Sequence, residues 1–222
     1  MPTVEATRGL AAAGITRDRL GRNRLRSLTD RERLLYRWIL GRFATSGRPR
    51  RTDVEGEAHR LGLDLPAALA TLAREDLVCL GPDGEIAVAY PFSGRPTAHR
   101  VRLRRGHEAY AMCAIDALGI APMLGEEIEI FSSDPLTGEE IEVALAPNGE
   151  GRWPQSAVVV SGTTASDAGS CGSCCPVLNF FASHDNAETW LDARSDVRGV
   201  VISLEEAILA GREVFGNVLK EA

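Results

Sequence analysis

Lysine is almost absent from this 222-residue chain, because Lys220 is the only one and nearly all positive charge is carried by arginine. The net charge of -6 gives no general reason to expect a nucleic-acid partner. Residues 1–60 nevertheless hold 14 arginines against 7 acidic residues. Such a segment can bind phosphates, but the interspersed acids favour a solvated helical surface instead.

Long apolar runs are also missing, since no stretch approaches the ~20 residues that cross a membrane. The N-terminus offers only the short run 9–15, preceded by Glu5 and Arg8, which makes a poor secretory signal. We therefore expect a cytoplasmic protein without membrane contacts. Hydrophobic residues make up 44% and charged residues 25%, which argues for a globular chain.

Several common site motifs are absent. The four histidines, at positions 59, 99, 107 and 184, lack metal-ligand spacing. There is no phosphate-binding glycine loop and no Gly-x-Ser-x-Gly nucleophile turn. We expect no cofactor.

Five cysteines are present, an odd number, and three of them fall within five positions: Cys171, Cys174 and Cys175. Adjacent cysteines make an awkward disulfide framework, so reactive or metal-binding thiols are favoured in a reducing compartment. Cys171 and Cys174 have zinc-type spacing, but no second pair completes a four-ligand site. A strand is expected after the motif, which argues against a thioredoxin-like site.

The periodicity predicts an α+β fold in three parts: an arginine-rich extension over 1–27, a winged-helix-like domain over 28–90 and a catalytic domain over 91–222. The middle part should contain three helices and a hairpin, beginning with a capping box at Thr29–Glu32. Its predicted helices cover 30–44, 52–62 and 66–75, and its strands cover 77–80 and 85–89.

Residues 90–96 resemble a linker in composition, and the chain beyond them should form a mixed, mostly antiparallel sheet with flanking helices. Residues 161–173 are small and polar and should form a mobile loop. Predicted strands cover 100–103, 127–131, 141–145, 157–160, 177–181 and 200–202, and predicted helices cover 107–118, 185–194 and 204–219.

Cys113 and Asp116 are the first candidate pair. Three positions apart on a helix, their side chains share a face, which places a soft nucleophile beside a proton carrier. A helical cysteine among apolar neighbours is more often a small core residue. A carboxylate at the edge of an apolar face, however, needs a partner or a purpose.

Two segments, Ala109–Leu118 and Cys174–Ser183, together resemble the signature blocks of the organomercurial (alkylmercury) lyase family, and the likeness extends over about 28–219. The resemblance implies that the chain cleaves carbon–mercury bonds by protonolysis. It also implies that Cys113 and Cys174 are the catalytic thiols, that Asp116 is the proton donor, and that these three residues hold the mercury of substrate and product. Mercury prefers thiolate ligands, and a positioned carboxylic acid can protonate the carbon.

The same resemblance implies an organomercurial substrate, small thiols, and a mercuric reductase as Hg(II) acceptor. If the segment is extended, Cys175 points away from Cys174 and is interpreted as structural or core. Cys171 is an addition to the family blocks, and no extra cysteine follows the catalytic helix within 119–140.

The alternative function is a non-catalytic metal-binding or metal-sensing protein with a winged-helix DNA-binding unit. Arg48, Arg50 and Arg51 could contact phosphates ahead of the second helix. The predicted third helix is alanine-rich, however, with Arg74 as its only basic residue. Nucleic-acid binding is therefore the less favoured interpretation.

Overall fold

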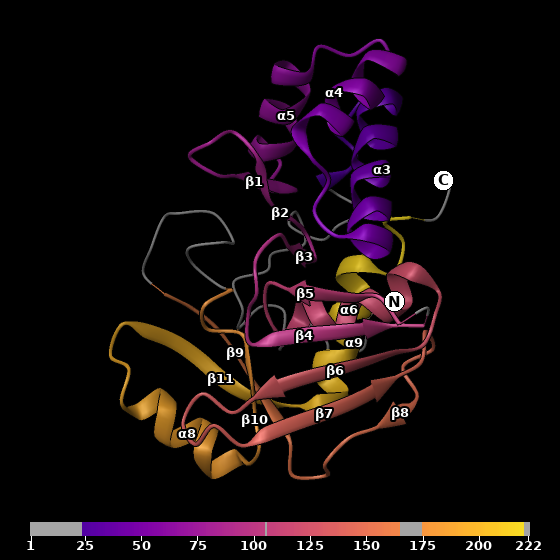
Figure 1. Ribbon diagram of the computed structural model, residues 1–222. Coiled ribbons are helices and arrows are strands. Elements are labelled where there is room, and N and C mark those ends of the chain that lie inside the picture. Colours follow the sequence, from indigo (N-terminus) through magenta and orange to yellow (C-terminus); the bar gives the residue numbers. More distant parts are fainter. Residues whose placement is uncertain (1–23, 105, 165–174, 220–222) are drawn as a thin grey trace.

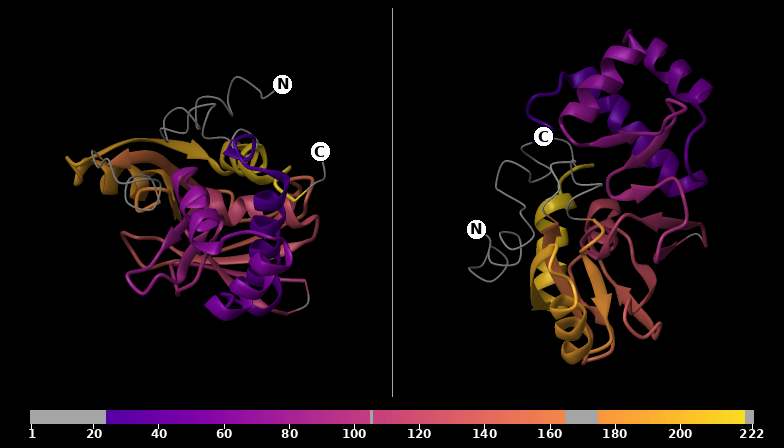
Figure 2. Two further views of the ribbon diagram at one scale, coloured as in Figure 1. Left: turned by 90° about the horizontal axis from the view of Figure 1, so that it is seen from above. Right: turned by 90° about the vertical axis from the view of Figure 1, so that its left-hand side faces the viewer.

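The computed structural model describes residues 24–104, 106–164 and 175–219 (Figure 1). Three helices gather at one end of the molecule, and two sheets with further helices beside them make up the rest, as Figure 1 and Figure 2 show. No helix in these described ranges is long and apolar enough to span a membrane.

The helical end follows the predicted order of three helices and a hairpin. The capping box at Thr29 is present, because the Glu32 amide donates to Thr29 Oγ1 at 3.3 Å and Glu32 Oε2 accepts from the Thr29 amide at 2.8 Å. The winged-helix description of this unit stays a prediction. The elements are α3 (Asp30–Ser46), α4 (Arg51–Arg60), α5 (Leu65–Arg74), β1 (Val78–Leu80) and β2 (Ile86–Ala89).

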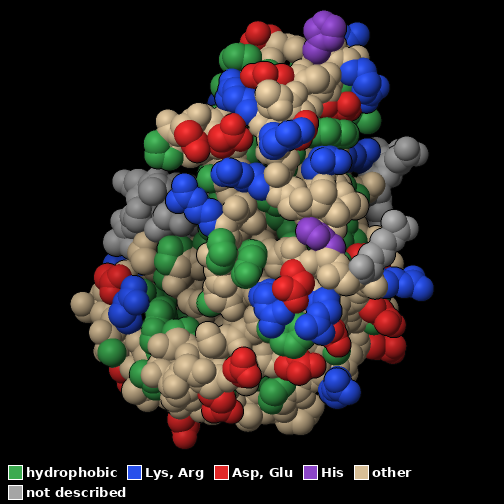
Figure 3. All heavy atoms as spheres, in the orientation of Figure 1, with side chains coloured by type: hydrophobic (Ala, Val, Ile, Leu, Met, Phe, Trp, Pro, Cys, Tyr) green, Lys and Arg blue, Asp and Glu red, His purple; other side chains and the backbone are tan. Residues whose placement is uncertain are grey.

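Several arginines of the helical end are paired with acids. Positive and negative side chains alternate over the helical end in Figure 3. Their pairs lie three or four residues apart, as solvated helix surfaces commonly arrange them. The α4 pairs are Arg50–Asp53, Arg51–Glu55 and Arg60–Glu57.

The predicted linker over 90–96 is wrong for its first half. Phe92–Ser93 forms β3, which pairs with β2 on one side and with β5 (Glu108–Ala111) on the other. Phe92 is buried and stacks on Phe43 of α3, with ring centroids 5.8 Å apart. Burial of these aromatic rings outweighs the turn-forming composition, so the hairpin and the following strands share one sheet.

The larger sheet has eight strands in the order β1-β2-β3-β5-β4-β6-β7-β8, and all its pairs are antiparallel. This agrees with the predicted mixed fold. Strand β8 was not predicted, since two residues leave no periodic signal. The remaining strands of this sheet are β4 (His99–Leu103), β6 (Ile128–Ser133), β7 (Glu140–Leu145) and β8 (Gly151–Arg152).

The helix predicted over 107–118 is wrong at its start. Residues Glu108–Ala111 form β5, and the helix α6 (Ala114–Leu124) begins only after Cys113. Alanine and tyrosine at 109–111 fit a helix locally, but pairing with β3 and β4 decides their conformation. Strand β5 therefore ends immediately before the first turn of α6.

A second, three-stranded sheet has the order β10-β9-β11. Ser161–Thr164, predicted as loop, belong to β9, because they pair with β11. The rest of the predicted loop, 165–173, lies outside the described residues. The elements are β9 (Val158–Thr164), β10 (Asn179–Phe181), β11 (Val197–Ser203), and the helices α8 (His184–Asp192) and α9 (Leu204–Phe215).

Helices α6 and α9 lie side by side (Figure 1), and two glycines allow their backbones to approach closely. A Cβ on Gly119 would lie 2.2 Å from Phe215 Cδ2, and one on Gly211 would lie 2.9 Å from the Gly119 amide nitrogen. Only glycine permits this backbone approach. The contact fixes α6, whose residues from Ala114 to Met123 are all buried.

Candidate active site

The site is built at the first turn of α6. Cys113 is the N-cap of this helix, with an extended backbone, and its sulfur accepts a hydrogen bond from the Asp116 amide at 3.4 Å. The Ala114 amide donates to the Leu178 carbonyl at 2.9 Å. This bond ties the start of α6 to the segment that leads into β10.

Cys113 and Asp116 are in direct contact. The Cys113 thiol donates to Asp116 Oδ2 at 3.1 Å, and both side chains are buried, with 2% and 5% exposure. Sequence spacing predicted that they would meet. They do so because the N-cap side chain folds over the third helical residue, rather than because both project from one helical face.

Cys175 lies beside the same carboxylate. Its sulfur is 3.9 Å from Asp116 Oδ2, and the ligand atoms of Cys113, Asp116 and Cys175 all lie within 4.8 Å of one another. It is buried, as a core residue would be, but its position in the cluster was not predicted. The expectation assumed an extended segment, whereas residues 175–177 form a turn. Cys171 and Cys174 lie outside the described residues.

Burial raises the pKa of the Asp116 carboxyl from 3.8 to about 7, because the charged form loses its hydration. The Cys113 thiol and the charge of Arg24 oppose this shift in pKa, and the charge of Asp76 adds to it. A carboxyl with this pKa can both accept and donate a proton near neutral pH.

The helical end supplies charges and contacts to the site. Arg24 and Asp76 form an ion pair at 3.1 Å, and Arg24 Nη1 also donates to the Asp76 carbonyl at 2.7 Å. The Tyr36 hydroxyl donates to the Tyr90 carbonyl at 2.7 Å. These pairs are 52 and 54 residues apart in sequence, so no local pattern could have revealed them.

Tyr90 contacts two cysteines through its hydroxyl, Cys175 at 4.0 Å and Cys79 at 3.8 Å. Cys79 is disulfide-bonded. The cysteine pattern had favoured thiols over disulfides, and at Cys79 this expectation is wrong. Cys113 and Cys175 are thiols, as expected.

The histidines do not join the cluster. His99 is buried and its Nδ1 lies 2.9 Å from Ser132 Oγ, while His184 pairs with Glu188 on α8. The candidate metal ligands in the described part of the chain are therefore two thiols and a carboxylate.

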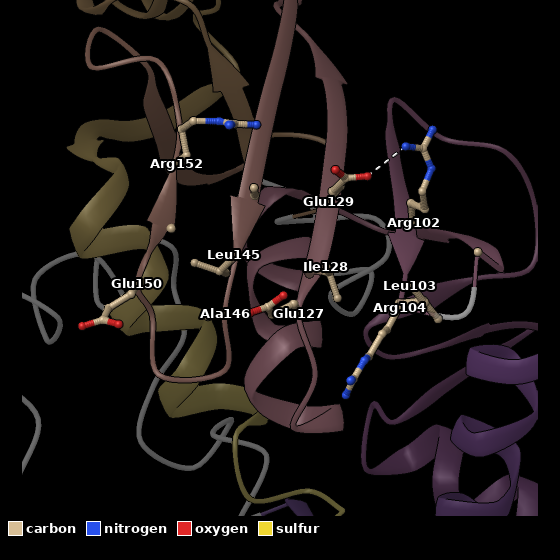
Figure 4. Close-up of a pocket in the computed structure, with 13 residues that line it drawn as sticks. Arg102, Leu103, Arg104, Glu127, Ile128, Glu129, Leu145, Ala146, Glu150 and Arg152 are labelled. Atoms are coloured by element: carbon tan, nitrogen blue, oxygen red, sulfur yellow. Dashed lines mark hydrogen bonds and ion pairs between the residues drawn. The ribbon is translucent and has the colours of Figure 1, made fainter.

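A pocket of about 560 Å³ lies away from this cluster, over strands β4, β6, β7 and β8 (Figure 4). Arg102 and Glu129 face each other across part of it, with Arg102 Nη1 and Glu129 Oε2 2.8 Å apart. Cys113, Asp116 and Cys175 do not line it. The buried cluster and this open, charged pocket are separate features.

Comparison with known proteins gives consistent results. The family model for alkylmercury lyase (MerB) matches residues 92–216. An alkylmercury lyase of Bacillus cereus is 35% identical over 118 residues, which is 53% of either chain, so the match spans about half of that relative. One from Staphylococcus epidermidis is 27% identical over 181 residues, 81% of either chain.

A crystal structure of the mercury-bound form of MerB2 has a similar fold. The TM-score is 0.72 at 22% identity, and the superposition covers 98% of this chain and 100% of the other. The fold similarity therefore includes the helical end as well as the sheets.

Proposed function

This chain belongs to the alkylmercury lyase family, and from that premise we propose that it cleaves the carbon–mercury bond of organomercurials by protonolysis. The products are a hydrocarbon and Hg(II). Cys113 and Cys174 supply the thiolates and Asp116 delivers the proton. Small thiols and a mercuric reductase are the proposed acceptors of Hg(II), in the cytoplasm.

The observation that carries this proposal is the buried hydrogen bond between the Cys113 thiol and Asp116. Mercury is a soft ion that prefers sulfur, so a thiolate at this position binds the metal of the substrate. The neighbouring carboxyl, with its pKa near 7, takes the proton that the thiol releases. One contact thus joins the metal ligand to the proton carrier.

The reaction balances without a cofactor. Two thiols and one R–Hg–X molecule give R–H, a mercury bis(thiolate) and HX. Each thiolate adds electron density to mercury and, through it, to the bonded carbon. The carbon then accepts the proton held by Asp116 as the carbon–mercury bond breaks.

The alternative, a metal sensor with a DNA-binding helix, has less support. Helix α5 buries Leu65, Ala68, Leu69 and Leu72 against the core. Arg74 is its only basic residue. That composition leaves little on α5 to contact phosphates or base edges.

The proposal is tested by incubating the protein with phenylmercury or methylmercury and excess small thiol, and measuring benzene or methane together with Hg(II). We expect multiple turnovers, and their loss in Cys113→Ser and Cys174→Ser. Asp116→Asn should bind mercury but release no hydrocarbon. Its matched control is Asp192→Asn, which changes an exposed acid on α8 and should keep full activity. Tight mercury binding without hydrocarbon would instead support the metal-binding alternative.

A further inference from the structure

Cys175 has surroundings that a core cysteine does not need. Its sulfur faces the Asp116 carboxylate at 3.9 Å and the Tyr90 hydroxyl at 4.0 Å. A cysteine that only fills space is surrounded by apolar groups. Here the thiol is instead part of a cluster that holds two sulfurs and a carboxylate oxygen within 4.8 Å of one another.

The described backbone that follows Cys175 is tied to the start of α6. Residues 175–177 form a turn, and Asn179 Nδ2 donates to the Pro176 carbonyl at 3.0 Å. The Leu178 carbonyl accepts from the Ala114 amide. The turn that carries Cys175 is therefore attached to the helix start that carries Cys113, and the two sulfurs are held together before any metal arrives.

We propose that Cys175 is a mercury-binding thiol that holds Hg(II) together with Cys113, beside Asp116. Two thiolates on preformed backbone suit a soft ion, and binding to them loses little conformational entropy. The inference rests on the proposed function only in assigning the source of the mercury, which is the cleavage product after small thiols have removed it from Cys113 and Cys174. It concerns a thiol that this reaction does not require.

The exchange step balances with small thiols alone. A mercury bis(thiolate) of a small thiol reacts with the Cys113 and Cys175 thiols to give protein-bound Hg(II) and two molecules of free small thiol. Each incoming protein thiol gives its proton to a departing small thiolate, as in thiol exchange generally. Run in reverse, the step hands the metal to the small thiols that carry it away.

The test uses the full-length Cys79→Ser/Cys171→Ser/Cys174→Ser variant, whose only cysteines are Cys113 and Cys175. Hg(II) is added with increasing competitor thiol, and bound mercury and its sulfur ligands are counted by mass spectrometry and X-ray absorption. We expect one Hg(II) per chain, bound by two protein sulfurs. Adding Cys175→Ser should lower the competitor concentration at half-release by at least tenfold.

Asp192→Asn, an exposed substitution on α8 that keeps both thiols, is the control and should retain the metal. If the triple variant does not fold, Cys175→Ser and Cys175→Ala in the otherwise unchanged chain should each lower the same midpoint. An unchanged midpoint, or fewer than two protein sulfurs on the metal, overturns the assignment. Hydrocarbon release is measured separately, so failure of the lyase function and failure of this site give different results.

Discussion

At the residue scale, the proposed chemistry depends on the Asp116 carboxyl, whose raised pKa keeps it neutral for part of the physiological pH range. Burial opposes the charge of Asp116, while the Cys113 thiol and the charge of Arg24 favour it. Such a group is costly to keep in a folded protein, because its ionised form lacks hydration. Its cost should be measurable as pH-dependent stability.

We predict that Asp116→Asn stabilises the protein at pH 8 by about 1–3 kcal/mol while it abolishes hydrocarbon release. The pKa of Asp116 is raised on folding, so its contribution to stability is fully present below 3.8 and is lost as pH rises through about 7. Chemical unfolding at pH 5 and pH 8 measures the difference between variant and wild type. A difference that does not grow with pH would contradict the prediction.

His99 should make the free energy of unfolding depend on pH in the opposite direction to Asp116. Burial lowers the pKa of this histidine from 6.5 to about 4, although a hydrogen bond with the Asn179 side chain acts to raise it. The neutral ring also packs edge-on against Phe180, with centroids 5.7 Å apart. The contribution of neutral His99 to the stability of the protein is therefore fully present above pH 6.5 and is lost as pH falls towards 4.

We predict that His99→Gln weakens this loss of stability between pH 6.5 and pH 4.5. The measurement is the free energy of unfolding at several pH values in that range. His184→Gln, which removes an exposed imidazole on α8, is the matched control substitution. Parallel curves for wild type and His99→Gln would rule out His99 as the source.

The spacing of Cys113 and Asp116 is visible in the sequence, but their contact depends on the N-cap position of Cys113, which the predicted helix start did not give. Cys175 was missed because alternation applies to extended chain, and the residue lies in a turn. Arg24, Tyr36 and Tyr90 reach the site through tertiary packing alone. Local patterns thus find a pair of neighbours in sequence but not the groups that tune them.

At the element scale, the position of the site depends on α6, and α6 is held by its glycine contact with α9. Capping signals predicted where α3 and α9 begin, because both caps are local hydrogen-bonded motifs. The start of α6 was predicted too early, since the pairing of β5 with β3 and β4 is non-local. The boundary that matters most for the site was therefore the one least visible in the sequence.

We predict that Gly119→Ala destabilises the protein by about 1–3 kcal/mol, because the new methyl group would overlap the Phe215 ring and force α6 away from α9. Gly41→Ala is the matched control within α3, where a Cβ meets nothing within 4 Å. It should stabilise the helix by up to about 1 kcal/mol. Equal effects of both substitutions on the unfolding midpoint would contradict the role given to this contact.

At the scale of the whole molecule, the helical end and the sheets are joined more closely than a linker would allow. Strand β3 continues the sheet between them, and the Arg24–Asp76 ion pair places opposite charges near Asp116. The sequence predicted both parts in outline, but the aromatic burial that joins them is a tertiary effect. The helical end therefore contributes to the electrostatics of the site.

We predict that Arg24→Gln shifts the alkaline limb of the pH–activity profile to higher pH. The charge of Arg24 lowers the pKa of Asp116, and its removal leaves Asp76 to raise it. Arg60→Gln, which breaks an exposed ion pair on α4, is the control and should leave the profile unchanged. Identical profiles for Arg24→Gln and wild type would show that the helical end does not tune the proton donor.

The most direct test of carbon–mercury protonolysis is hydrocarbon release from phenylmercury in D₂O with excess small thiol, followed by mass spectrometry of the benzene. The account predicts many turnovers per protein and benzene with a single deuterium, because the proton comes from exchangeable thiol and carboxyl groups. Asp116→Asn should bind mercury and release none. Absence of benzene from the wild-type protein, or deuterated benzene at an undiminished rate from Asp116→Asn, would contradict the account.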